Sequence, residues 1–144
     1  MARTEHDLDI YAWAHENAEL LRQGKFNEVD MVNVIEELED LGNSKRDQLT
    51  ARLKLIIQHL LKWQYQPSHR GRSWSLTIKN NRRDVEGLLE DVPSLKSKID
   101  ECFVKAYKRG AVAASDETDM PIKKFPQSCP YTLEEVLNPE FMPD

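Results

Sequence analysis

The stretch that decides the fold is VIEELEDLGNSKRDQLTARLKLIIQHLLKW, residues 34–63. Apolar residues recur in steps of three and four at both ends, from Ile35 to Leu38 and from Leu49 to Trp63. The seam keeps its phase through the polar segment between them, which predicts one long helix over about residues 30–65. The alternative is a break, with Gly42 ending one helix and Ser44 capping the next. We favour the continuous helix.

Helical periodicity continues on both sides of this stretch. Before it, apolar residues from Leu8 to Leu21 lie on roughly one helical face, and Gly24 is a C-terminal stop signal. After it, Pro67 and Gly71 end the long helix. A further helix is predicted from Ser73, and another opens near Asp91 or Ser94. We therefore expect an all-α helical bundle of about four main helices.

The last part of the chain, residues 118–144, has a different character. Five prolines in this segment preclude a long helix. Thr132 and Glu135 have the spacing of a capping box, so one short helix can form there. We expect a proline-rich extension that wraps over the bundle, anchored by Phe125, Tyr131, Leu137 and Phe141. With 144 residues, the chain fits a single helical domain over 1–144.

Composition excludes several classes of protein. No apolar run approaches the roughly 18 residues that a membrane span needs, so no membrane partner is expected. The N-terminal MARTEHDLDI has acidic residues where a secretory signal has an apolar core. Cys102 and Cys129 lack metal-binding spacing and fit reduced thiols. These features predict a cytoplasmic protein without a cofactor.

Charge is strongly partitioned along the chain. Residues 1–44 hold 3 basic and 11 acidic side chains, residues 45–83 hold 10 basic and 1 acidic, and residues 84–144 hold 7 basic and 13 acidic. Either the basic block 45–83 faces an anionic partner, or it neutralises the acidic block 1–44 within the fold or across a dimer. Internal or inter-protomer ion pairing is the interpretation that we prefer.

The acidic cluster is a candidate metal site. Glu36 and Asp40 are one helical turn apart and share a face, which suits a hard cation. If the first two helices form a hairpin, His15 lies near Glu36 and Glu37, giving a site of the di-metal carboxylate type. The Glu-x-x-His pairs of such bundles are absent, however. A solvated acidic face is the alternative.

The basic block is a candidate site for an anion or a partner. Clustered cations contact phosphates, and single-stranded nucleic acid also needs aromatic platforms for stacking. Trp63 and Trp74 continue apolar seams, however, and the acidic overall composition disfavours a dedicated nucleic-acid binder. The candidate residues of this anion or partner site are Arg46, Lys62, His69, Arg70, Arg72, Arg82 and Arg83.

Four segments in the same order carry a resemblance to a known family. They are DIYAWAHENAELLRQGKF, the E-E-x-E-D-L-G motif with the H-L-L-K-W-Q-Y-Q-P run, SWSLTIKNNRRDVEGLLEDVPSL, and KKFPQSCPYTLEEVL. Together they resemble the bacterial domain of unknown function 29 family over nearly the whole chain. The resemblance implies a compact helical fold and no settled activity.

No catalytic motif accompanies these features: the nucleophile-elbow, phosphate-loop, dinucleotide-binding and zinc-protease patterns are all missing. The sequence therefore favours an interaction module that meets a protein partner, or a second copy of itself as a homodimer, through its charge-divided surface. One alternative is nucleic-acid or phosphate binding through the basic block. The other is a metal-dependent hydrolase that uses the His15 and carboxylate cluster.

Overall fold

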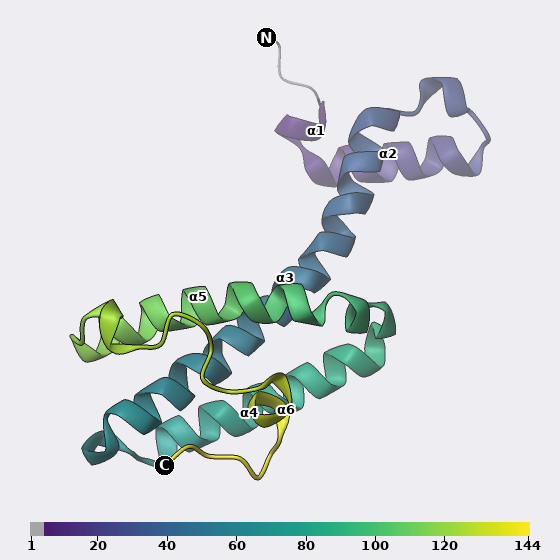
Figure 1. Cartoon of the computed structure of the whole chain (residues 1–144). Coiled ribbons are helices and arrows are strands. Elements are labelled where there is room, and N and C mark those ends of the chain that lie inside the picture. Colours follow the sequence, from purple (N-terminus) through teal and green to yellow (C-terminus); the bar gives the residue numbers. More distant parts are fainter. Residues whose placement is uncertain (1–4) are drawn as a thin grey trace. The chain divides into compact units, whose positions relative to one another are not determined.

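The computed structural model describes residues 5–144, and these residues form helices without any strand. The expected all-α fold with four long helices is confirmed (Figure 1). The α-helices are α1 (Glu5–Leu8), α2 (Ile10–Arg22), α3 (Met31–Tyr65), α4 (Arg72–Asp91), α5 (Ile99–Thr118) and α6 (Leu133–Leu137). Short 3-10 turns lie between them: η1 (Phe26–Glu28), η2 (Pro67–His69), η3 (Pro93–Ser97) and η4 (Ile122–Lys124).

Helix α3 is continuous over 35 residues, as the unbroken seam predicted. Gly42 lies inside it and has no positive φ, so the alternative of a break at this residue is wrong. A glycine in a helix interior costs about 1 kcal/mol relative to alanine. The helix continues through Gly42 because extending an existing helix adds about one backbone hydrogen bond for each residue that is ordered.

Several helix ends lie where the sequence signals predicted them. Gly24 follows α2 with a left-handed φ of 72°, and Thr132 with Glu135 forms the expected capping box of α6. Two starts differ from the prediction. Helix α4 begins at Arg72, before Ser73, with Gly71 as its N-cap. Helix α5 begins only at Ile99, because the segment from Pro93 first forms the turn η3.

The described chain divides into two compact units. The first ends at Asn43, and the second runs from Ser44 to Asp144. Helix α3 contributes residues to both. A compact unit is not by itself an independently folding domain. A single domain over residues 1–144 therefore stays a prediction.

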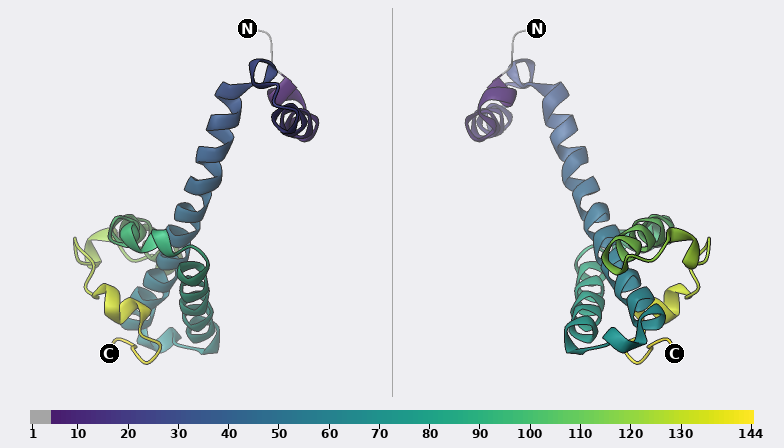
Figure 2. Two further views of the ribbon diagram at one scale, coloured as in Figure 1. Left: turned by 90° about the vertical axis from the view of Figure 1, so that its right-hand side faces the viewer. Right: turned by 90° about the vertical axis from the view of Figure 1, so that its left-hand side faces the viewer.

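The second unit contains the hydrophobic core. Leu49, Leu53, Ile56, Ile57, Leu60 and Leu61 of α3 are fully buried. They pack with residues of α4, α5 and the C-terminal segment, which lie beside this part of α3 in both views (Figures 1 and 2). Gly110 of α5 permits the closest approach, since an added Cβ would lie 3.2 Å from the carbonyl oxygen of Lys54.

The proline-rich extension is fastened to this core. Phe125, Tyr131 and Val136 are buried, and Leu137 with Phe141 packs against the cluster. The Tyr131 hydroxyl also donates to Gln64 Oε1 of α3 at 2.7 Å. The expected aromatic and aliphatic anchors are confirmed.

The first unit is held together differently. Among its described residues, the buried apolar side chains are Trp13 and Val29. Trp13 Nε1 donates to the Asp30 carboxylate at 2.8 Å, and the Asp30 amide donates to the Asn17 side chain at 2.8 Å. Polar contacts therefore fix the turn between α2 and α3, while little apolar surface is buried. No helix within residues 5–144 is long and apolar enough to cross a bilayer.

Candidate functional site

The first unit exposes an unusual amount of apolar surface. Ten large apolar residues between positions 5 and 43 are exposed, whereas the second unit, with more than twice the length, exposes four. Scattered single apolar residues are normal on protein surfaces, whereas a concentration of them is a feature of interaction surfaces in general. The ten are Leu8, Ile10, Tyr11, Leu21, Phe26, Met31, Val32, Ile35, Leu38 and Leu41.

Part of this surface forms a groove between α2 and the N-terminal part of α3, here called the α2–α3 groove. It has a volume of about 540 Å³. Leu38 and Leu41 lie on its α3 side, each 64% exposed. Helical spacing places Val34 on the same side. The full lining is Trp13, Ala14, Asn17, Ala18, Leu21, Val34, Glu37, Leu38, Asp40 and Leu41.

Acidic side chains contribute the polar part of the lining. Glu37 and Asp40 lie one turn apart on α3, between the apolar positions. Oε1 of Glu37 lies 2.6 Å from Nε2 of His6, and this hydrogen bond raises the pKa of His6, against the opposing effect of desolvation. The His6 ring also packs edge-on against Trp13, with ring centroids 4.6 Å apart. Helix α1 is thereby attached beside the groove.

Asp30 is another acidic group of this unit with defined contacts. It accepts hydrogen bonds from Asn33 Nδ2 and Trp13 Nε1, both at 2.8 Å, and these bonds lower its pKa. A carboxylate with a lowered pKa remains ionised to more acidic pH. The contact with Trp13 Nε1 fixes an indole that lines the groove.

The residues of the predicted metal site lie in this unit but have other neighbours. The His15 ring contacts Tyr11, with centroids 4.5 Å apart, and Glu37 is bonded to His6. Glu36 is exposed and Asp40 lines the groove. Within residues 5–144, no group of three or more His, Cys, Asp or Glu residues is arranged to hold a metal ion. The hydrolase hypothesis gains no supporting constellation in the described part of the chain.

Arg82 of the predicted anion site has a structural partner instead. Its guanidinium donates to the carbonyl oxygens of Val136, Glu135 and Phe141 at 2.8, 3.2 and 2.9 Å. Two of these carbonyls belong to α6, whose C-terminal end favours a cation. Burial lowers the pKa of Arg82, so the side chain is a desolvated anchor for the C-terminal segment.

Arg70 and Lys62 are also engaged within the second unit. Arg70 donates to the Trp63 carbonyl at 2.7 Å and to the Asp144 carbonyl at 2.6 Å, and its guanidinium lies over the Trp63 ring. Lys62 forms a short ion pair with Glu117, and its ammonium lies 4.6 Å from the centroid of the Trp74 ring. These contacts hold both side chains within the second unit. Neutralisation of the acidic block 1–44 by the basic block stays a prediction.

The remaining predicted cations are more accessible. Arg46 is half-buried, with Nε 3.9 Å from the Asp47 carboxylate. His69, Arg72 and Arg83 are exposed. The basic block is therefore divided between structural cations and free ones. Charge counts along the sequence could not separate the two groups, because the carbonyls that bind Arg82 and the Glu117 carboxylate that binds Lys62 lie more than 50 positions away.

Two structural features of this unit were missed from the sequence. The His6–Glu37 contact was not foreseen, although His6 precedes the Asp9 cap of α2, which turns the chain there. The α2–α3 groove was not foreseen either. Its signal was present in the sequence, since Val34, Leu38 and Leu41 are apolar positions among the carboxylates that we interpreted as a solvated face.

The fold and this surface define an all-α protein with a packed helical unit and an acidic helical pair that carries uncovered apolar side chains. Residues 6–142 match the family described as Domain of unknown function DUF29, and the chain belongs to that family. Neither the curated proteins nor the solved structures contain a significant match.

Proposed function

We propose that the protein is a protein-interaction module whose α2–α3 groove binds an amphipathic helix with basic flanking residues in a partner protein. The observation that carries the proposal is the exposed apolar surface of residues 5–43, where ten large apolar side chains are exposed. Grooves of this kind bind the apolar face of a helix through side chains spaced three and four residues apart.

The chemistry of the partner follows from charge. Residues 1–44 hold 3 basic and 11 acidic side chains, and Glu37 and Asp40 lie in the groove itself. A helix with lysine or arginine beside its apolar face complements this surface and associates faster as a result. A second copy would bring another acidic groove, and like charges in contact oppose association. We therefore favour a basic partner over self-association.

The test uses a synthetic amphipathic helix of leucine and lysine, about four turns long, so that it presents one apolar stripe. A matched peptide with glutamate in place of lysine is the control. Titration calorimetry of the full chain with the lysine peptide should give binding at one site. The glutamate peptide should not bind, because its charge has the same sign as the groove.

Variants locate the binding. Leu38→Gln with Leu41→Gln removes apolar side chains from the groove without changing charge, and we expect roughly a tenfold or greater loss of affinity. Val104→Gln with Val112→Gln is the matched control, because these side chains are 64% and 52% exposed in the second unit. Equal losses from both double variants would contradict the proposal.

Light scattering of the free protein tests whether a second copy of the chain occupies the groove instead of a basic partner. We expect a monomer at micromolar concentrations. A dimer that dissociates with Leu38→Gln and Leu41→Gln, together with no binding of the lysine peptide, would replace the basic partner by a second copy.

A further inference from the structure

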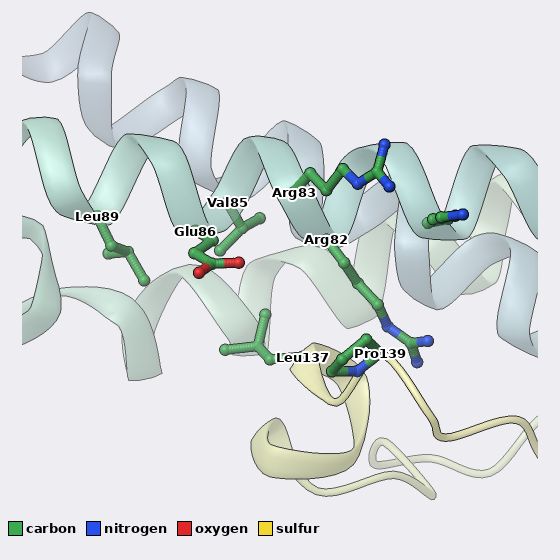
Figure 3. Close-up of a pocket in the computed structure, with 8 residues that line it drawn as sticks. Arg82, Arg83, Val85, Glu86, Leu89, Leu137 and Pro139 are labelled. Carbon is green, nitrogen blue, oxygen red and sulfur yellow. The ribbon is translucent and has the colours of Figure 1, made fainter.

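A second cavity lies between α4 and the C-terminal segment in the second unit (Figure 3). It has a volume of about 410 Å³, within the range of small-molecule sites. Val85 and Leu89 of α4 lie on one side, and Leu137 and Pro139 lie across from them. The remaining lining residues are Lys79, Arg82, Arg83 and Glu86.

Arg82 is the unusual member of this lining. It is 7% exposed, and its hydrogen bonds go to neutral main-chain carbonyls through Nε and Nη2. No carboxylate within residues 5–144 forms an ion pair with it. A buried cation without a counter-ion is costly unless an anion is supplied.

One nitrogen of Arg82 is left for such an anion. Nη1 has no hydrogen-bond partner in the described part of the chain. Among the described residues, the fully buried side-chain polar atom without a partner is Gln58 Oε1, so Arg82 Nη1 is not fully buried. Nη1 is therefore accessible to solvent, and the side chain that carries it lines the cavity.

The other charged groups reinforce this preference. Lys79 and Arg83 lie one turn and one residue from Arg82, and both are exposed. Glu86 is the single acidic residue of the lining, so its three cations leave a net formal charge of +2. Because the other four lining residues are apolar, a bound anion with a hydrocarbon body also gains from burial of that body.

We propose that this cavity, here called the α4 pocket, binds a small amphipathic anion: a carboxylate on an aliphatic or aromatic body. The carboxylate accepts hydrogen bonds from Arg82 Nη1 and is neutralised by Lys79 and Arg83. The apolar body contacts Val85, Leu89 and Leu137. This site is separate from the α2–α3 groove and does not depend on the function proposed for it.

Octanoate is the test ligand, and binding is followed by amide chemical shifts of the full chain and by calorimetry. We expect one site, with shifts concentrated in residues 79–89 and 137–139. Octylamine tests the sign of the charge, 1-octanol tests the need for charge, and acetate tests the need for an apolar body. Each should bind roughly tenfold more weakly than octanoate, because each lacks one of the matched features.

Variants decide between a built site and general adsorption. Lys79→Gln with Arg83→Gln should weaken octanoate roughly fivefold through the lost charges and leave 1-octanol unchanged. Lys105→Gln with Lys108→Gln, exposed lysines on α5, is the control and should not affect either ligand. An octanoate affinity that the Lys79 and Arg83 changes leave unaltered, or shifts located away from α4, would overturn the proposal. So would the absence of shifts at millimolar octanoate.

Discussion

Nε2 of His6 lies 2.6 Å from Oε1 of Glu37, and this contact joins α1 to α3 beside the α2–α3 groove. The histidine that meets the acidic cluster is therefore His6, whereas the sequence had suggested His15. The hydrogen bond raises the pKa of His6 above its usual value of 6.5. The strength of this contact between α1 and α3 therefore depends on pH.

The first prediction concerns this attachment. A group whose pKa is raised by folding stabilises the folded state fully below its unfolded pKa, and the stabilisation is lost as pH rises through the folded pKa. We expect His6 to titrate above 6.5 in an NMR titration of the histidine ring protons. His59 should titrate below 6.5, because burial lowers its pKa.

Glu37→Gln is the variant that tests the cause. It removes the negative charge and should return the pKa of His6 towards 6.5 while leaving that of His59 unchanged. Glu36→Gln is the matched control on the next residue, since Glu36 is exposed. An unchanged His6 titration in Glu37→Gln would show that another group causes the shift.

The second prediction concerns Arg82. Replacing it by methionine leaves three carbonyl oxygens without their donor, so the free energy of unfolding should fall by about 2 to 4 kcal/mol. Arg83→Met is the matched control. Arg83 is exposed and has no hydrogen bond or ion pair within residues 5–144, so its removal should change stability by less than about 0.5 kcal/mol. Urea denaturation measures both, and equal effects would remove the anchoring role of Arg82.

The third prediction compares two glycines inside helices. A Cβ at Gly110 would lie 3.2 Å from the Lys54 carbonyl oxygen, whereas a Cβ at Gly87 meets nothing within 4 Å. Gly87→Ala should raise the free energy of unfolding by about 0.5 to 1 kcal/mol through helix propensity. Gly110→Ala should lower it by about 1 kcal/mol, because α3 and α5 must separate and this exceeds the gain in propensity. Stabilisation by both variants would show that the helix contact is loose.

The fourth prediction concerns the ion pair of Lys62 and Glu117. Hydrogen bonds from Lys62 and then Gln58 lower the pKa of Glu117 below 4.5, against the effect of desolvation. A group whose pKa is lowered by folding contributes stability above its unfolded pKa, and this contribution is lost as pH falls through the folded pKa. Lys62→Met should remove most of this loss between about pH 5 and 3. Melting curves across that range, compared with Lys96→Met as an exposed control, test the assignment.

The long helix and the capping box were predictable because they depend on neighbours along the chain. The periodicity from Ile35 to Trp63 fixed α3 through Gly42, and the spacing of Thr132 and Glu135 fixed the start of α6. The start of α5 was misplaced, since proline at position 93 allowed a 3-10 turn before the helix. Local patterns do not distinguish these two outcomes.

The roles of the charged residues were less predictable. Arg82 and Arg83 are adjacent in sequence, yet one is buried against the C-terminal segment and the other is exposed. Composition records the same charge for both. Their difference depends on contacts with carbonyl groups more than 50 positions away, which no pattern around position 82 encodes. The groove was not predicted for a different reason. Its apolar residues on α3 are interspersed with carboxylates, and the segment was interpreted as a solvated acidic face.

Amide chemical-shift mapping with the leucine–lysine peptide tests most directly whether the groove of the first unit is an interaction surface. We expect shifts concentrated in residues 13–21 and 34–41, where the peptide contacts Leu38 and Leu41. Shifts located in the second unit, or no shifts at millimolar peptide, would contradict it.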